Sequence, residues 1–243
     1  MPTKDVEAVT TKQPNAMHTC KRVIPGEEVV SLFGDKSARA MASLHCDLDQ
    51  YLRLKDAQDR RLYLYGAIGV VDYDVFGEDS VTAWLIEQIM TFNRIDKGTP
   101  PHEREPIRLY INSPGGDLVE GTALISAMEL SKTPIWTINV GQWCSMAFLI
   151  GIAGKKRLSL PNATFLMHDG TSGAFGSTSK VQDQMEFEKR FEKEVVKAHV
   201  LKHSTMKGVD YDALARVELY MLPEDALERG FIDEIVTDID TIL

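Results

Sequence analysis

The stretch IWTINVGQWCSMAFLIGIA, residues 135–153, places a strand pattern, a turn and a helix pattern in one run. The apolar residues from Ile135 to Val140 predict a buried strand, and the apolar or small residues from Met146 to Ala153 predict a buried helix. Ser145 stands at the turn between them. A serine there can hold its hydroxyl clear of the backbone, and the free N–H groups of the helix start point toward it. This arrangement suits a nucleophile, provided that a base lies nearby.

Two further segments end strand patterns in the same way. His168 follows the apolar run from Ala163 to Met167 and is a candidate base. Ser113-Pro114-Gly115-Gly116 follows the strand pattern 107–111, and two glycines let the backbone approach a ligand closely and offer N–H groups to an oxyanion. Each signal alone has a plain explanation, namely a helix N-cap, a structural histidine and a turn. Together they fit the carboxyl edge of a parallel sheet, where α/β folds place their sites.

The rest of the chain alternates between strand and helix patterns. Strands are predicted at 61–69, 107–111, 135–140, 156–160, 163–167 and 231–236, and helices at 35–55, 80–92, 117–131, 146–153, 178–203, 210–217 and 223–229. This alternation predicts an α/β fold with largely parallel strands. Residues 1–30 are polar and aperiodic and are expected to form a flexible N-terminal arm. We expect residues 31–243 to form a single domain.

The predicted helix 178–203 contains no Gly or Pro and is highly charged. Its apolar residues lie on about half of the helix circumference, which predicts a long exposed helix with one apolar face; they are Val181, Met185, Phe187, Phe191, Val195 and Ala198. Gly208 is expected to end it. His199 and His203 are four residues apart, but the Glu of an H-E-x-x-H motif is missing. A solvated helix face is therefore predicted there, and no metal site.

Composition narrows the range of partners. The net charge of the 243 residues is −9, and Lys and Arg are scattered, so neither nucleic acid nor an anionic membrane is an expected partner. No apolar stretch approaches the roughly 18 residues that span a bilayer, and the N-terminus lacks the apolar segment of a secretory signal. Three cysteines, Cys20, Cys46 and Cys144, make no disulfide framework. A cytoplasmic protein is expected.

Several motifs follow one another in an order that is familiar from one family. They are YINSPGG at 110–116, GQ and SM at 141–142 and 145–146, LPN at 160–162, MH at 167–168 and PEDALERGFID at 223–233. With these motifs the chain resembles the proteolytic subunit of Clp proteases (ClpP), a serine peptidase of the ClpP/crotonase-like superfamily, from about Arg60 to Val236. The resemblance implies a repeated β-β-α superhelix from which a long handle helix, 178–203, protrudes.

The resemblance also implies a site and an assembly. Ser145 would be the nucleophile and His168 the general base, and the backbone N–H groups of Gly116 and Met146 would form the oxyanion hole. Members of the family stack two seven-membered rings around a chamber that holds the sites. An AAA+ unfoldase uses ATP to feed unfolded polypeptides into that chamber, so no cofactor is expected in this chain itself.

The sequence departs from the family pattern at several positions. Trp143, Cys144 and Ala147 replace two alanines and a glycine around Ser145, and Trp143 either reshapes the substrate groove or packs in the core. The position of the third triad member, an Asp, falls on Val217. Glu218 beside it is the favoured substitute, with Asp210 and Asp212 close by, and an absent acid is the remaining alternative. Without an orienting acid the rate would fall by roughly 10⁴.

These patterns support four candidate functions. The first is a serine endopeptidase subunit of an ATP-dependent Clp-type protease, which hydrolyses unfolded polypeptides through an acyl-enzyme. The second is a catalytically impaired ClpP-like scaffold subunit. This alternative is considered because the sequence does not identify the acid of the triad. A phage-type maturation protease is a variant of the first. The third class is a crotonase-like acyl-CoA enzyme, because that superfamily shares the architecture and the paired N–H groups.

Overall fold

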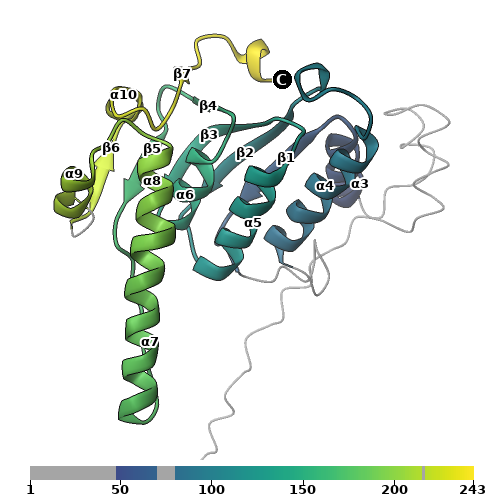
Figure 1. Cartoon of the computed structure of the whole chain (residues 1–243). Coiled ribbons are helices and arrows are strands. Elements are labelled where there is room, and N and C mark those ends of the chain that lie inside the picture. The colour runs from purple at the N-terminus through teal and green to yellow at the C-terminus, as the bar shows by residue number, and fades with distance from the viewer. Residues whose placement is uncertain (1–47, 70–79, 215–216) are drawn as a thin grey trace, which may run out of the picture. The chain divides into compact units, whose positions relative to one another are not determined.

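The structure, a computed structural model of the chain, describes residues 48–69, 80–214 and 217–243 (Figure 1). The predicted N-terminal arm 1–30 and the first part of the predicted helix 35–55 lie outside these ranges. Residues Arg53–Leu243 form one compact unit, and Met1–Leu52 belong to another. The sheet and the candidate site both lie within the unit Arg53–Leu243.

The described elements follow the predicted alternation closely. The helices are α3 (Leu48–Gln58), α4 (Val81–Ile95), α5 (Leu118–Leu130), α6 (Met146–Ile152), α7 (Thr178–Phe191), α8 (Ala198–Lys202), α9 (Gly208–Leu214) and α10 (Pro223–Glu228). The strands are β1 (Arg61–Tyr65), β2 (Ile107–Ser113), β3 (Ile135–Cys144), β4 (Lys156–Ser159), β5 (Thr164–Met167), β6 (Leu219–Met221) and β7 (Glu234–Ile235). Short 3₁₀ turns occur at Pro101–Glu103 and Ile239–Ile242, and a π-helical segment, Glu192–Lys197, joins α7 to α8.

The described strands form one seven-stranded sheet, most of it parallel. Its main path runs β1-β2-β3-β4-β7, while β5 pairs with β3 and β6 pairs with β5. All pairs are parallel except β5 with β6. The predicted α/β class with a largely parallel sheet is therefore confirmed. The β-β-α superhelix that the resemblance implies stays a prediction.

Strand β3 changes its neighbour halfway along its length. Residues 136–139 pair with β4, whereas residues 142–144 pair with β5. Between these two parts the register with β2 shifts, from Ile111 opposite Asn139 to Ser113 opposite Trp143. Extra residues in one strand bend it and re-aim the part of the strand beyond them. The bend thus directs the end of β3, and the turn after it, toward the end of β5.

The core lies between the sheet and the helices α4, α5 and α6, which cover one of its faces (Figure 1). Every residue of α6 is buried, as its uninterrupted apolar sequence predicts. The rings of Phe148 in α6 and Phe231 meet edge to face, with centroids 4.8 Å apart. A buried Phe contributes roughly 1.5–3 kcal/mol to folding. This burial anchors the helix that begins directly after Ser145.

The helical run that begins at Thr178 extends away from the body of the unit, as Figure 1 shows in green. It ends at Lys202, so the prediction that Gly208 ends it is wrong. The Ser204 hydroxyl donates to the Val200 carbonyl (2.7 Å) and accepts from the Met206 N–H (3.2 Å), which closes the helix end. Gly208 instead begins α9. The role of this run as a handle stays a prediction.

Two predictions at the C-terminal end of the sheet need correction. The strand predicted at 231–236 is reduced to Glu234–Ile235, and the strand Leu219–Met221 has no counterpart among the predictions. A strand of three residues is too short for its sequence to show the alternation of apolar and polar residues, and this strand forms because it pairs with β5.

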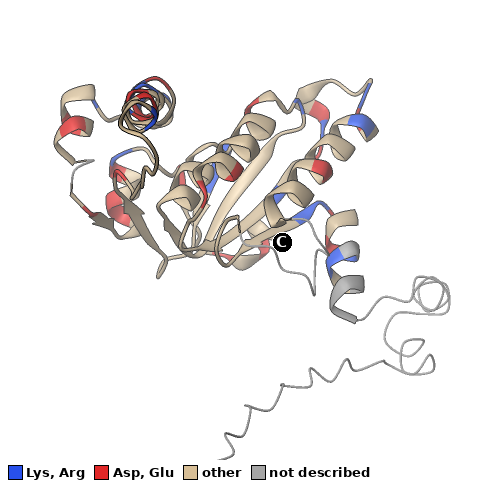
Figure 2. Cartoon of the chain, turned by 90° about the horizontal axis from the view of Figure 1, so that it is seen from below, with Lys and Arg blue, Asp and Glu red and all other residues tan. Residues whose placement is uncertain are grey.

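Charged residues of both signs are interspersed along the described elements (Figure 2).

A partly buried ion pair joins Arg60, which directly precedes β1, to Asp96, the C-cap of α4. Arg60 donates to both carboxylate oxygens of Asp96, at 2.6 and 2.9 Å, and the Thr133 hydroxyl donates to the same carboxylate at 2.7 Å. The exposed fractions of the Arg60 and Asp96 side chains are 13% and 9%. The Arg60 hydrogen bond is the main cause of the lowered pKa of Asp96, and it outweighs the opposing effect of burial.

Replacing Asp96 with Ala should lower the free energy of unfolding by about 2 kcal/mol, between the roughly 0–1 kcal/mol of exposed pairs and the roughly 3–5 kcal/mol of buried ones. Urea unfolding at neutral pH measures the change. Because the pKa of Asp96 is lower in the folded state, its contribution is complete above the unfolded pKa of about 4 and disappears as the pH falls through the folded pKa. Asp59→Ala, in an exposed pair with Arg61, is the control and should change stability little. Equal losses in both variants would contradict the prediction.

Candidate active site

Ser145 occupies a strained turn between β3 and α6. Its backbone angles are φ 53° and ψ −123°, a region that residues with a side chain seldom adopt. The Ser145 N–H donates to the Leu166 carbonyl (2.9 Å), and the Ser145 carbonyl accepts from the N–H groups of Phe148 (3.0 Å) and Leu149 (3.3 Å), which holds the turn. The Ser145 side chain makes no capping hydrogen bond to α6. Ser145 is thus the N-cap residue of α6 by position, but its hydroxyl is not used for capping, and the turn has the geometry that presents a reactive hydroxyl.

The loop after β2 lies against this turn. A Cβ atom on Gly115 would lie 2.7 Å from the Ser145 Cβ and 2.9 Å from the Met146 nitrogen, so only glycine fits there. Gly115 has φ +95° and Gly116 has φ +148°, conformations that glycine adopts readily. The structure thus brings the Ser-Pro-Gly-Gly segment, Ser145 and Met146 together, as the sequence predicts.

Two backbone N–H groups remain available beside Ser145. Within the loop, the Gly115 N–H donates to the Ser113 hydroxyl (3.1 Å) and the Asp117 N–H to the Ile68 carbonyl (3.0 Å). The Gly116 N–H has no hydrogen-bond partner among the described residues. Met146 is the first residue of α6, and such N–H groups find no acceptor within their own helix. A pair of fixed N–H donors of this kind can stabilise a developing oxyanion.

Helix packing fixes the position of Met146. Its side chain is buried and lies directly over Gly121 of α5, where any Cβ atom would overlap it. The missing side chain at Gly121 therefore lets α5 and α6 approach closely. Because α6 cannot shift against α5, the N–H groups at its start keep their direction.

His168 lies at the same edge of the sheet, directly after β5. Leu166, two residues before it, is opposite Cys144 in the β3–β5 pair and accepts the Ser145 N–H. The His168 Nε2 atom is buried and has no hydrogen-bond partner in the described part of the chain. No hydrogen bond joins the His168 ring to Ser145 either. The fold brings the two residues to neighbouring strand ends without a bond between their side chains, and in unliganded enzymes such bonds are often long.

The candidate acids differ in their surroundings. In the β5–β6 pair Met167 is opposite Leu219, so the next position outward sets Glu218 opposite His168. The Glu218 carboxylate accepts a hydrogen bond from the Tyr220 hydroxyl at 2.6 Å. Asp212 is bonded to Lys197 at 2.5 Å, and Asp210 lies in the first turn of the same helix, α9. Register therefore favours Glu218 over both aspartates as a neighbour of the imidazole.

The residues before Ser145 have structural explanations. Trp143 is fully buried and packs edge to face on Phe165, with ring centroids 5.4 Å apart. Its ring also covers Gly151 of α6, where a Cβ atom would overlap it. Of the two alternatives for Trp143, core packing is therefore confirmed. Burial raises the pKa of the Cys144 thiol, which keeps it protonated at neutral pH.

The solvated face predicted for His199 and His203 is wrong for His199. Only 9% of its side chain is exposed, because α8 packs against α6 and the ring reaches the Leu149 carbonyl. Glu129 of α5 accepts hydrogen bonds from Lys202 (2.8 Å) and His203 (2.9 Å). Burial would raise the pKa of Glu129, but these bonds outweigh it and lower the pKa to about 2.

A family model described as Clp protease matches residues 75–238 of the 243-residue chain. The chain belongs to the Clp protease family. The matched range includes the loop 113–116, Ser145 and His168, and the match supports a peptidase of this family. Among the described residues no helix combines the length and the apolar character that crossing a membrane requires.

Replacing Gly115 with Ala should abolish the chemistry of this site. The new Cβ would press on Ser145 and on the Met146 nitrogen, and the positive φ adds strain. We expect labelling of the full-length protein by a fluorophosphonate probe to fall at least about 100-fold, the typical effect of losing one oxyanion donor.

Gly208→Ala is the matched control, because a Cβ there meets only ordinary contacts and φ is not positive. Its labelling should equal that of the unmodified protein. Full labelling of the Gly115→Ala variant would show that the close approach of this loop to Ser145 is not needed.

Proposed function

We propose that the protein is a serine endopeptidase that cleaves polypeptides through an acyl-enzyme formed on Ser145. The observation that carries the proposal is the strained Ser145 turn, with Gly115 packed against it and the Met146 N–H beside it. Strain of about 1–3 kcal/mol per residue persists where the surrounding structure enforces it, and it gathers at functional sites. The family match supports a peptidase independently of this geometry.

The reaction would run in two halves. The His168 ring takes the Ser145 hydroxyl proton as the oxygen attacks the peptide carbonyl, and the Gly116 and Met146 N–H groups stabilise the oxyanion. The protonated ring then gives its proton to the leaving amine, which leaves the acyl group on Ser145. Water, deprotonated by the same ring, releases the acid and restores the serine.

This mechanism requires the Ser145 and His168 side chains to meet. Their backbones are already close, because Leu166, two residues before His168, is bonded to the Ser145 N–H. A buried ring nitrogen without a partner is costly, and a hydrogen bond to the Ser145 hydroxyl would relieve that cost for His168 Nε2. In the proposed mechanism a side-chain rotation on substrate binding makes this contact.

Glu218 is the proposed orienting acid. Its register position opposite His168 supports this role, and its hydrogen bond to the exposed Tyr220 hydroxyl is one that solvent can replace. A carboxylate bonded to one ring nitrogen fixes the tautomer and stabilises the imidazolium that forms. In this chain a Glu would thus do the work of the Asp that the family pattern places nearby.

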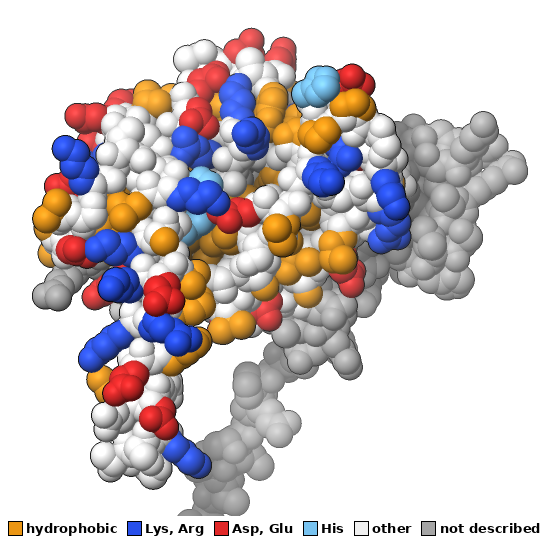
Figure 3. Space-filling model, viewed as in Figure 1, with side chains coloured by type: hydrophobic (Ala, Val, Ile, Leu, Met, Phe, Trp, Pro, Cys, Tyr) orange, Lys and Arg blue, Asp and Glu red, His pale blue; other side chains and the backbone are white. Residues whose placement is uncertain are grey.

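We further propose that the subunits assemble as two stacked seven-membered rings in the cytoplasm. An AAA+ unfoldase would spend ATP to supply unfolded polypeptides. Support comes from the run α7–α8, which exposes Met185, Phe187 and Val195. Figure 3 shows apolar side chains along this run between charged ones. Exposed apolar side chains on a projecting helix suit contacts between rings.

The rival proposal is a catalytically impaired scaffold subunit. One observation favours it: among the described residues no chain of hydrogen bonds links Ser145, His168 and a carboxylate. Serine-probe labelling of the assembled protein separates the two proposals, because a scaffold without a working pair would not be labelled.

Replacing Ser145 with Ala should lower kcat for peptide hydrolysis by at least about 10⁴-fold and abolish fluorophosphonate labelling, because no other group supplies the nucleophile. Peptide turnover and intact-protein mass spectrometry measure the two effects. Native mass spectrometry should show the same oligomer for the variant and the parent. Undiminished turnover in the variant would reject the assignment of Ser145, and a monomer in both would reject the ring proposal.

Replacing Glu218 with Gln should lower kcat by up to about 10⁴-fold, since an uncharged partner no longer stabilises the imidazolium. The Asp212→Asn variant is the matched control, because Asp212 is held by Lys197 and should leave kcat within a few-fold. Steady-state kinetics across pH, with KM and kcat separated, give the readout. A larger loss in Asp212→Asn than in Glu218→Gln would move the orienting role to α9.

A further inference from the structure

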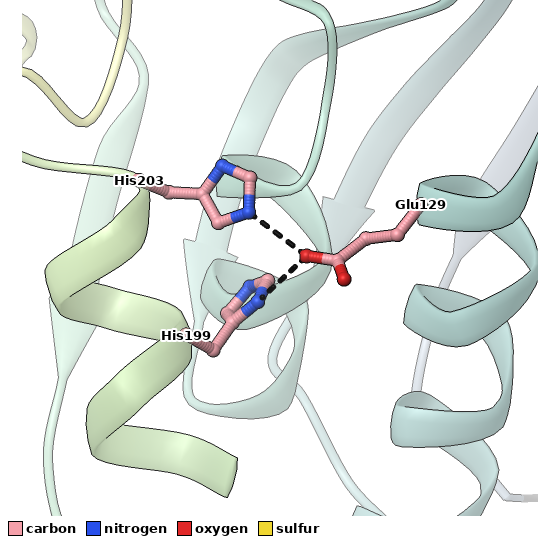
Figure 4. Close-up of side chains that lie close together, drawn as sticks. All are labelled: Glu129, His199 and His203. Atoms are coloured by element: carbon pink, nitrogen blue, oxygen red, sulfur yellow. Dashed lines mark hydrogen bonds and ion pairs between the residues drawn. The ribbon is translucent and has the colours of Figure 1, made fainter.

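A second cluster of polar side chains lies away from Ser145, at the base of the long helical run. Glu129 projects from the end of α5, and His199 and His203 project from α8 and its C-cap (Figure 4). The Glu129 Oε1 atom lies 2.9 Å from His203 Nε2 and 3.4 Å from His199 Nδ1. One ligand atom from each of the three residues falls within 4.8 Å of the others.

The hydrogen bond of His199 to the backbone determines which of its nitrogens is free. His199 Nε2 lies 2.9 Å from the Leu149 carbonyl, which can only accept, so Nε2 carries the hydrogen. In the neutral ring the Nδ1 lone pair then faces the Glu129 oxygen. Two lone pairs 3.4 Å apart repel each other unless a proton or a metal cation lies between them.

The three side chains offer ligand types that zinc binds, and their ligand atoms all lie within 4.8 Å of one another. Zn²⁺ binds imidazole nitrogen and carboxylate oxygen at about 2.0–2.2 Å, so neighbouring ligand atoms of a tetrahedral site lie roughly 3.3 Å apart. The observed separations of 3.4 and 2.9 Å bracket that value. His199 in α8 and His203 at its C-cap are four residues apart, a spacing that places side chains on the same side of a helix. The Leu149 carbonyl supplies the second hydrogen bond that orients a metal-bound imidazole.

We propose that Glu129, His199 Nδ1 and His203 Nε2 bind a divalent transition metal ion, with zinc as the best match, and thereby tie α8 to α5. Three protein ligands leave one coordination position for water. The bound ion would brace the base of the run α7–α8 directly after the π-helical segment Glu192–Lys197. Such segments are frequent at functional sites.

Lys202 is the competitor for this position. Its ammonium group lies 2.8 Å from the same Glu129 oxygen, and 59% of its side chain is exposed. An exposed lysine can turn into solvent at little cost, so an incoming cation with three ligands displaces it. Removing the lysine charge should therefore strengthen metal binding. A mere ion-pair cluster would show no such gain.

The cluster is open to solvent from two sides. A groove of about 270 Å³ is lined by Glu129, His199 and Leu149, and a wider hollow of about 900 Å³ is lined by Glu129, Lys202 and His203. In Figure 3 a histidine reaches the surface among positively and negatively charged side chains above the long helical run. A metal ion can therefore enter the folded protein.

The test is titration of metal-free, full-length protein with Co²⁺, followed by displacement with Zn²⁺. We expect one Co²⁺ per chain, the visible absorption of a tetrahedral Co²⁺ complex, and its loss on adding Zn²⁺. His203→Gln and Glu129→Gln should each weaken Co²⁺ binding at least about 100-fold, since each removes a ligand. Lys202→Met should tighten binding several-fold. Circular dichroism confirms that each variant is folded.

His102→Gln is the matched control, because His102 is a histidine with an 80% exposed side chain outside the cluster. Its Co²⁺ affinity should equal that of the unmodified protein. The proposal is overturned if no stoichiometric Co²⁺ complex forms, or if His203→Gln and Glu129→Gln bind as tightly as His102→Gln. Weaker binding by Lys202→Met than by the unmodified protein would also overturn it.

Discussion

The hydrogen bond from the Ser145 N–H to the Leu166 carbonyl is the interaction on which the candidate site depends. It continues the pairing of β3 with β5 by one residue, past the point where β3 ends. That extra bond holds Ser145 at φ 53°, a conformation that costs about 1–3 kcal/mol. The burial of α6 on the other side of the turn offsets this cost. The strained conformation of Ser145 therefore depends on both the strand pairing before it and the buried helix after it.

The course of β3 also determines where the other groups of the candidate site can lie. Because β3 bends after Asn139 and changes partner from β4 to β5, its end meets the carboxyl ends of β2 and β5 together. The loop that leaves β2 then passes so close to Ser145 that Gly115 has no room for a side chain. Donors and hydroxyl are thus positioned by backbone contacts, which vary less than side-chain rotamers. In the proposed mechanism His168 and Glu218 have to rotate their side chains, so their bonds would be completed only when substrate binds.

Two histidines in this chain show how differently burial can act. His168 keeps a buried ring nitrogen without a partner beside a candidate nucleophile. His199 has one nitrogen satisfied by the Leu149 carbonyl and the other facing a carboxylate. Desolvation is the largest influence on His199 and lowers its pKa. The Leu149 carbonyl thus orients the His199 ring, whereas no backbone hydrogen bond to the His168 ring is found among the described residues.

Patterns in the sequence alone determined the α/β class, most element positions and the residues of the candidate site. Runs such as 135–140 and 146–153 are recognisable because apolar residues of one period are local information. What only the tertiary structure decided depends on contacts between distant segments. The short strand Leu219–Met221 exists through its pairing with β5, and that register, rather than any motif, brings Glu218 opposite His168. Likewise the sequence predicts a solvated His199 on a charged helix, and only the packing of α8 against α6 buries it and turns it toward Glu129. Periodicity in the sequence predicts which face of a helix or strand is apolar. The partner of each polar side chain depends on which segments the tertiary structure brings together.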